Sequence, residues 1–153
     1  MPYKIRMAKS DDMSAVLKLI KELADFENEP NAVEVSVADL VNDYENKLFS
    51  CLVAEAQSTI VGIALYYHRY STWKGKTIHL EDLMVTKNQR GKGVGKALLN
   101  AVVEKAKAAN LKRVEWNVLD WNTPAIDFYK SVGATVFNDW LVVQLDEKGI
   151  NNY

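Results

Sequence analysis

The first third of the chain predicts one strand followed by two helices. Residues 3–8 alternate weakly between apolar and polar side chains, as a strand with one buried face does. Ser10 is placed to cap the helix that follows, while Ser36 and Asp39 have the spacing of a capping box and predict a second, short helix ending near Lys47. The apolar residues of the first helix recur every three or four positions and share one face: Met13, Val16, Leu17, Ile20, Leu23 and Ala24.

Three further strands and a long helix are expected in the middle of the chain. Residues 48–56 and 60–70 are rich in β-branched and aromatic side chains, and the polar residues 57–59 between them predict a hairpin. Another strand is expected over residues 76–85. Residues 91–95 contain three glycines and precede a helix whose apolar positions again have helical spacing: Val94, Ala97, Leu98, Ala101, Val102, Ala106 and Ala109.

The last third predicts a strand, a helix and closing strands. Residues 113–119 have strand composition. A helix is expected to begin at Thr123 with Pro124 in its first turn and to end at Gly133, because proline is tolerated at a helix start and glycine is favoured just past its end. Residues 135–145 are expected to complete the sheet as further strands.

This order of elements predicts an α/β (α+β) fold in which helices flank a mixed, mostly antiparallel sheet. The chain has 153 residues, which is an ordinary size for one hydrophobic core. We find no repeat, low-complexity run or linker that would divide it. Residues 1–153 are therefore expected to form a single domain.

The net charge and the length of the apolar runs exclude some classes of binding partner. The net charge of −1 gives no broad basic face for nucleic acid. The apolar runs are only as long as strands, and the first residues lack the build of a secretory signal, so we expect no membrane partner and a cytoplasmic location.

Cys51 is the only cysteine and lies in an apolar run, which favours a buried side chain. His68 and His79 have no ligand spacing, and we predict no metal.

The strongest chemical signal is the segment from Arg90 to Lys96. Its glycines, Gly91, Gly93 and Gly95, let an anion approach the backbone where a helix begins and presents unpaired N–H groups. The basic side chains of the segment, Arg90, Lys92 and Lys96, add positive charge. The pattern therefore predicts a phosphate site.

Two common phosphate loops do not fit this segment. A nucleotide P-loop needs four residues between its first glycine and Gly-Lys-Ser/Thr, but Gly91 and Gly95 enclose three, and Ala97 takes the place of the hydroxyl residue. A dinucleotide fingerprint needs a third glycine where Leu98 stands.

Arg90-Gly91-Lys92-Gly93-Val94-Gly95 instead resembles the pyrophosphate loop of the GNAT N-acetyltransferase superfamily. Further segments resemble its diamine (spermidine/spermine) and thialysine acetyltransferase branch in order and spacing, over nearly the whole chain. They are Lys21-Glu22-Leu23-Ala24, Leu52-Val53-Ala54-Glu55, Ile60-Val61-Gly62, Tyr66-Tyr67, Leu80-Glu81-Asp82, Trp121-Asn122-Thr123-Pro124 and Phe128-Tyr129-Lys130.

The resemblance implies acetyl-CoA as co-substrate and an amine as acceptor. It implies coenzyme contacts from the strand residues Leu83, Met84 and Val85, from the loop residues Arg90, Gly91, Lys92, Gly93, Val94, Gly95 and Lys96, and from Asn122 and Tyr129. Asn122 is also placed to cap its helix. Tyr129 matches the residue that protonates the coenzyme thiolate, and the ordinary tyrosine pKa of about 10 suits that role.

Glu81 and Asp82 interrupt an apolar strand, where an unpaired carboxylate is costly to bury. In a regular pleat the two face opposite sides. An alkylamine has a pKa of about 10.4, so only roughly one molecule in a few thousand is neutral at pH 7, and a carboxylate base would help. By resemblance Glu81 is the candidate base and Asp82 lies near the substrate ammonium. The other interpretation is that both carboxylates are exposed or structural.

By resemblance the acceptor cleft also contains Glu22, Phe26, Glu27 and Trp73, since acidic and aromatic groups suit a cation. The sequence departs from the polyamine enzymes at Phe26, where they have tyrosine, and at Ser71, where they have aspartate. Alternatives are an amino acid or a protein N-terminus as acceptor, or a non-catalytic module that binds coenzyme A. The branch also implies a homodimer, with the C-terminal strands near the partner.

Overall fold

Five strands form one mixed sheet in the order β1-β2-β3-β4-β5, so every strand lies beside its neighbour in the chain. The strands are β1 (Lys4–Met7), β2 (Ser50–Ala56), β3 (Thr59–Ser71), β4 (Gly75–Val85) and β5 (Val114–Glu115). The first four pair antiparallel, and β5 pairs parallel to β4. The predicted mixed, mostly antiparallel sheet is therefore confirmed.

The computed structural model describes residues 2–153 in two compact units, Met1–Asn117 and Val118–Tyr153. The first unit holds the sheet together with α1 (Met13–Phe26), α2 (Val37–Glu45), α3 (Val94–Ala108) and two short 3-10 turns, η1 (Ser10–Asp12) and η2 (Lys87–Gln89). The second unit holds α4 (Thr123–Ser131) and α5 (Glu147–Asn151).

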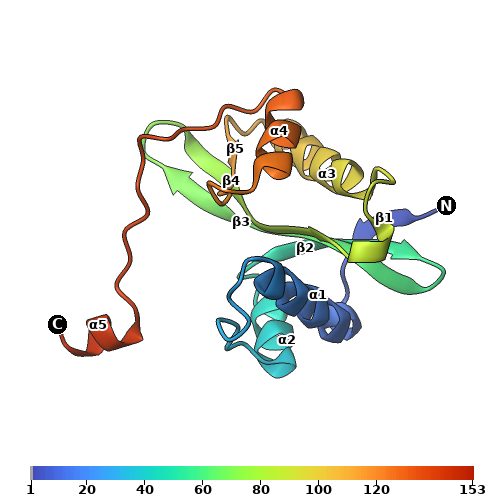
Figure 1. Ribbon diagram of the computed structural model, residues 1–153, viewed down its shortest axis with the longest axis horizontal. Helices are drawn as coiled ribbons and strands as arrows, with labels where there is room; N and C mark the ends of the chain where they lie inside the picture. The colour runs from blue at the N-terminus through green and yellow to red at the C-terminus, as the bar shows by residue number, and fades with distance from the viewer. Residues whose placement is uncertain (1) are drawn as a thin grey trace. The chain divides into compact units, whose positions relative to one another are not determined.

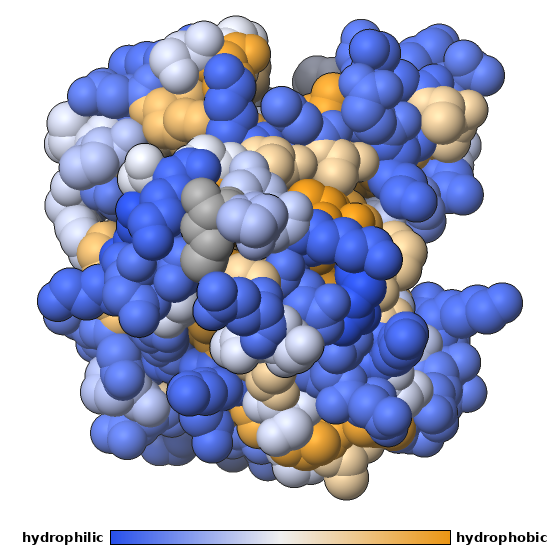
Figure 2. All heavy atoms as spheres, turned by 90° about the vertical axis from the view of Figure 1, so that its right-hand side faces the viewer, coloured by the Kyte–Doolittle hydropathy of each residue, from blue (hydrophilic) through white to orange (hydrophobic). Residues whose placement is uncertain are grey.

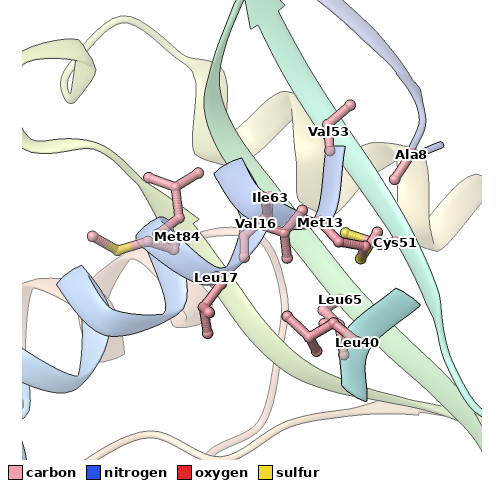
Figure 3. Packing of buried hydrophobic residues seen from close by; sticks show 11 residues of the cluster. Ala8, Met13, Val16, Leu17, Leu40, Cys51, Val53, Ile63, Leu65 and Met84 are labelled. Atoms are coloured by element: carbon pink, nitrogen blue, oxygen red, sulfur yellow. The ribbon is translucent and has the colours of Figure 1, made fainter. Parts of the chain in front are cut away.

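In the first unit, helices cover both faces of the sheet: α1 and α2 lie on one face and α3 on the other (Figure 1). The face under α1 and α2 carries the main hydrophobic cluster, which Figure 3 shows in close-up. Cys51 lies within this cluster and is fully buried, as predicted, and burial raises the pKa of its thiol to about 12. The cluster is made of Ala8, Met13, Val16, Leu17, Leu19, Leu40, Cys51, Val53, Ile63, Leu65 and Met84.

The capping of the first two helices was predicted correctly in one case and wrongly in the other. At α2, Ser36 Oγ accepts from the Asp39 N–H and the Asp39 carboxylate accepts from the Ser36 N–H, which is the predicted capping box. At α1, Ser10 is not the cap, because the 3-10 turn η1 precedes the helix. The Asp12 carboxylate accepts the Lys9 N–H there, and Ser10 Oγ donates to Glu45.

Two strand predictions near the C-terminus need correction. The strand expected over 113–119 pairs only over Val114–Glu115. Residues 135–145 form no strand, although their composition favours one. A strand needs a hydrogen-bonded neighbour, and within residues 2–153 this segment has none. Leu141 and Val143 are consequently 86% and 91% exposed.

Gly62 on β3 sets the close approach of α3 to the sheet. A Cβ atom at this position would lie 3.0 Å from Leu98 Cδ1, 3.3 Å from Val94 Cγ1 and 3.2 Å from the Met84 carbonyl oxygen. The Met84 oxygen belongs to the paired strand β4 and cannot move away freely. Only glycine therefore fits without displacing α3 or distorting the sheet.

We expect Gly62→Ala to lower the free energy of unfolding by about 1–3 kcal/mol, because overpacking forces backbone shifts. Urea unfolding followed by circular dichroism measures this. Thr59→Ala, at an exposed position of the same strand, is the control and should change stability by less than about 0.5 kcal/mol. Equal stability of the two variants would contradict the packing argument.

Candidate active site

The glycine loop begins directly after η2 and ends in the first turn of α3. Gly91 and Gly93 have φ angles of +77° and +83°, a region that glycine adopts readily and other residues rarely. Gly93 is the N-cap residue of α3. The Tyr3 hydroxyl donates to the Gly93 carbonyl oxygen at 3.3 Å and so ties the loop to the chain before β1.

The start of α3 fits a pyrophosphate. No side chain among residues 2–153 caps it, and its first turn has no acidic residue. Its first amides therefore remain available as donors, with the partial positive charge of a helix start. A Cβ at Gly91 would meet no atom within 4 Å, which shows open space beside the loop. Lys92 and Lys96 are exposed there, and Lys92 Nζ donates to Gln89.

Arg90 is folded away from the open side of the loop. Its Nε donates to the Val85 carbonyl oxygen at 2.8 Å, and its guanidinium carbon lies 5.6 Å from the centroid of the Phe26 ring. Its NH2 group is 4.0 Å from the Glu22 carboxylate. Arg90 thus joins the end of β4 to the end of α1.

Glu22 has a role here that sequence reasoning missed. Its carboxylate accepts from Thr86 Oγ1 at 3.0 Å and from the Lys87 N–H at 3.0 Å, and so holds the residues that lead into the loop. The sequence placed Glu22 in the acceptor cleft. The structure places it at the junction of α1, β4 and the loop. Only the tertiary contact between α1 and Thr86 could have shown this.

Strand β4 is paired on only one edge along most of its length. β5 pairs with β4 only at Ile78 and His79, whereas β3 stays paired to the end of β4. Within residues 2–153, β4 therefore has no strand on its β5 side before Ile78, nor in its second half from Leu80 to Val85. Leu83, Met84 and Val85 lie in this half, where an extended arm could pair with backbone groups, as the sequence predicted for pantetheine.

The carboxylates that sequence analysis singled out lie at an irregularity in β4. Leu80 pairs with Tyr66 and Asp82 pairs with Leu65, so Glu81 is an extra residue in the ladder, as in a β-bulge. The assumption of a regular pleat was therefore wrong at this point. A bulge re-aims side chains, and here Glu81 is exposed while Asp82 is partly buried.

Glu27, Glu81 and Asp82 form a cluster of like charges, hereafter the carboxylate cluster. Burial, then the charges of Glu81 and Glu27, raise the pKa of Asp82 to about 6. Desolvation, then the charge of Glu81, raise the pKa of Glu27. The charge of Glu81 thus makes Glu27 and Asp82 harder to ionise, and a cation bound among the three would relieve the repulsion.

Of three other predicted residues, one lies far along β4 from the carboxylate cluster, and two belong to the second unit. Trp73 is 79% exposed in the β3–β4 turn, roughly 20 Å along β4 from Glu81 at the usual rise per strand residue. Asn122 and Tyr129 belong to the second unit. Asn122 Oδ1 accepts the Ala125 N–H at 3.4 Å and is the N-cap of α4. Tyr129 is half-buried on α4, with the ring of Phe128 at 5.5 Å. Their coenzyme contacts stay predictions.

The first unit also has an open hollow of about 600 Å³ beside the first half of α1 and the β2–β3 turn. Its lining includes Glu22 and Thr86 but none of the carboxylate cluster. It lies at the end of the unit where, on the face in Figure 2, hydrophilic residues predominate. We do not place the acceptor in it.

Two kinds of structural feature are absent from residues 2–153. Among residues 2–153, no group of three or more histidine, cysteine or acidic side chains is arranged to hold a metal ion. No helix in the same range is long and apolar enough to span a bilayer.

Comparison with known proteins identifies the family. The model of the acetyltransferase (GNAT) family matches residues 17–134. The chain belongs to the GNAT acetyltransferases. This match includes β4, the glycine loop and α4, and so extends across the boundary between the two units. The N-acetyltransferase predicted from the sequence is confirmed, while the single domain over residues 1–153 stays a prediction.

Individual relatives agree with this family. The acetyltransferase is 41% identical over 140 residues to the thialysine N-epsilon-acetyltransferase of Bos taurus, covering 85% of this chain and 82% of that one. It is 38% identical over 141 residues to the human spermidine/spermine N(1)-acetyltransferase-like protein 1, covering 86% of this chain and 20% of the relative. A predicted acetyltransferase of Clostridium acetobutylicum, crystallised with acetyl-CoA, shares the fold with a TM-score of 0.76 at 20% identity. The match covers 94% of this chain and 97% of that one.

We expect the stability of Asp82→Asn to depend on pH differently from that of the natural chain. Since the pKa of Asp82 is about 6 in the fold, against an ordinary value of 3.8, ionising it costs more in the folded than in the unfolded state. Stability is thus lost as pH rises from about 4 to above 6. Asparagine avoids this cost, so the variant should be more stable by about 1–3 kcal/mol at pH 8.

Denaturant unfolding at pH 4 and pH 8 measures both states. The advantage of Asp82→Asn should vanish at pH 4, where the natural side chain is also neutral. Asp11→Asn, at an exposed position, is the control. An equal effect of Asp82→Asn at both pH values would show that the carboxyl is not perturbed.

Proposed function

We propose that this acetyltransferase transfers acetyl from acetyl-CoA to a primary amine of a small cationic molecule, of the diamine, polyamine or thialysine type. The observation that carries this proposal is the carboxylate cluster, because three adjacent acidic groups favour an ammonium ligand. The printed names of the relatives, thialysine and spermidine/spermine acetyltransferases, agree with such an acceptor.

Acetyl-CoA would be held by two features of the first unit. The amides at the start of α3, with Lys92 and Lys96, would bind its pyrophosphate, and the free edge of β4 from Leu83 to Val85 would pair with its pantetheine arm. When bound, the coenzyme supplies the activated acetyl group. Arg90 would contact the pyrophosphate only after leaving Phe26 and Val85.

The residues of this chain then have distinct tasks. The charges of Glu27 and Asp82 hold the acceptor ammonium, and Glu81 takes one proton from it. The neutral amine attacks the acetyl carbonyl directly in a ternary complex, so that a C–N bond forms and the C–S bond breaks. Tyr129 supplies a proton to the departing thiolate, and the second proton that leaves the nitrogen replaces it, so that Tyr129 is restored. Each turnover releases one net proton, which must reach solvent.

A panel of amines tests this proposal. Release of coenzyme A thiol is measured with diamines, polyamines, thialysine, lysine and a peptide N-terminus, and acetyl-CoA binding is measured by calorimetry. We expect turnover with the small amines and little with the peptide. Binding without turnover for any amine would leave a coenzyme-binding module, and absence of binding would contradict the proposal altogether.

Tyr129→Phe should lower kcat by about a hundredfold, because the general acid is lost while the ring is kept. Calorimetry with coenzyme A should show an unchanged dissociation constant. The neighbouring Phe128→Tyr is a matched control that leaves the Tyr129 hydroxyl in place. An unchanged kcat in Tyr129→Phe would remove the tyrosine from the mechanism.

We also propose a homodimer in which residues 135–145 contact a second copy. This segment has strand composition but no strand neighbour within residues 2–153, and it exposes a run of apolar side chains: Phe137, Trp140, Leu141, Val142, Val143 and Leu145. Pairing with another copy would satisfy its backbone and cover these side chains.

Replacing Leu141 and Val143 by aspartate should shift the protein from dimer to monomer, since buried charges oppose association. Light scattering after size-exclusion chromatography measures the mass. Lys148→Asp, an exposed charge change on α5, is the control. A dimer that survives the double substitution would place the interface elsewhere.

A further inference from the structure

His79 is a buried polar side chain to which the proposed mechanism gives no task. It lies on β4 two residues before Glu81 and is only 6% exposed. Its Nδ1 atom is buried and has no hydrogen-bond partner among residues 2–153. Buried polar atoms are usually paired, so an unpaired ring nitrogen beside a candidate base calls for a physical reason.

Both ring nitrogens face carboxylates. Nε2 lies 3.6 Å from Glu81 Oε1, and Nδ1 lies 3.6 Å from Glu115 Oε1. A neutral imidazole has a single N–H and can donate to only one of them, leaving a lone pair directed at the other. Whichever nitrogen carries the proton can donate it to the carboxylate that it faces, and the other nitrogen can accept one. A proton that arrives on Glu81 therefore has a neighbouring group suited to receive it.

The groups on the two sides of the His79 ring define a direction for proton transfer. Glu115 on β5 pairs with Arg69 at 2.6 Å and lies 3.7 Å from Arg113, and its side chain is 26% exposed. On the Glu81 side, the Tyr67 hydroxyl donates to Glu81 at 3.5 Å, and the Tyr67 ring lies 5.2 Å from the His79 ring. The sequence of groups thus runs from exposed Glu81 through buried His79 to partly exposed Glu115.

We propose that His79 is a positioning residue for Glu81 that also relays the proton taken from the acceptor ammonium toward Glu115 and solvent. This rests on the proposed function, in which Glu81 is the base and one net proton leaves per turnover. The proton on Glu81 moves to Nε2 while the proton on Nδ1 moves to Glu115, which releases it to water. Glu81 is then ready for the next ammonium, and the ring regains its Nδ1 proton by tautomer exchange before the relay acts again, so that no atom or electron is gained or lost.

The position of His79 explains why the relay is available here. It forms the last paired position between β4 and β5, and beyond it β4 has a free edge where the pantetheine arm is proposed to pair. The relay therefore leads away from the reacting atoms on the side that β5 closes. Glu115, opposite His79 in the register, is fixed by that pairing.

The test compares His79→Phe, which keeps an aromatic ring but removes both nitrogens, with Glu115→Gln, which keeps the ring and removes its acceptor. His68→Phe, at the exposed histidine of β3, is the matched control. In His79→Phe we expect kcat to fall roughly tenfold with acceptor KM changed less than about threefold, and the acidic limb of the kcat/KM profile to move to higher pH. Glu115→Gln should move the same limb in the same direction, and added imidazole should restore part of the His79→Phe rate.

Wild-type kcat and pH profiles in both variants would overturn the relay. If His79→Phe fails to fold, as circular dichroism would show, Glu115→Gln decides alone, because its side chain is partly exposed. A measurement that does not depend on turnover separates failure of the relay from failure of the proposed function. The ring ¹⁵N resonances of His79 should shift in both Glu81→Gln and Glu115→Gln. If neither shifts them, the contacts and the relay are wrong, even in a protein that binds coenzyme and acetylates amines.

Discussion

The change in pairing along β4 is the constraint on which the rest of this structure depends. At Ile78 and His79 the strand has a neighbour on both edges, and beyond His79 it keeps only β3. An unpaired edge inside a covered sheet leaves backbone groups that need a partner. We propose that the pantetheine arm of the coenzyme is this partner, so that the unpaired edge of β4 would serve as a binding feature. The bulge at Glu81 lies just beyond the same point and removes the regular alternation that would separate Glu81 from Asp82.

Around this point, like charges are held close together by apolar packing. The cluster under α1 and α2 fixes the sheet, and the end of α1 brings Glu27 toward β4. The fold thereby holds carboxylates at a distance where they repel each other, which is the kind of local cost seen at functional sites. The same helix sends Glu22 to Thr86, so α1 supports both the acceptor side and the approach to the glycine loop.

The glycine loop is tied to other parts of the first unit by the side chain of Arg90. Arg90 joins the glycine loop to Phe26 at the end of α1 through a cation–π contact and to Val85 at the end of β4 through a hydrogen bond to its carbonyl oxygen. Phe26 is also where the sequence departs from the polyamine enzymes. A phenyl ring provides the face for this guanidinium but has no hydroxyl that could donate a hydrogen bond.

The sequence by itself determined the main helices, the glycine loop and the family. Helical periodicity, the Ser36 capping box and the spacing of Gly91, Gly93 and Gly95 depend on neighbouring residues, which a sequence contains in full. Only the tertiary structure decided the bulge at Glu81 and the pairing of His79 with Glu115, because register between strands depends on residues distant in the chain. The failed strand prediction for residues 135–145 has the same cause: strand composition is local, but a strand exists only where a neighbour pairs with it.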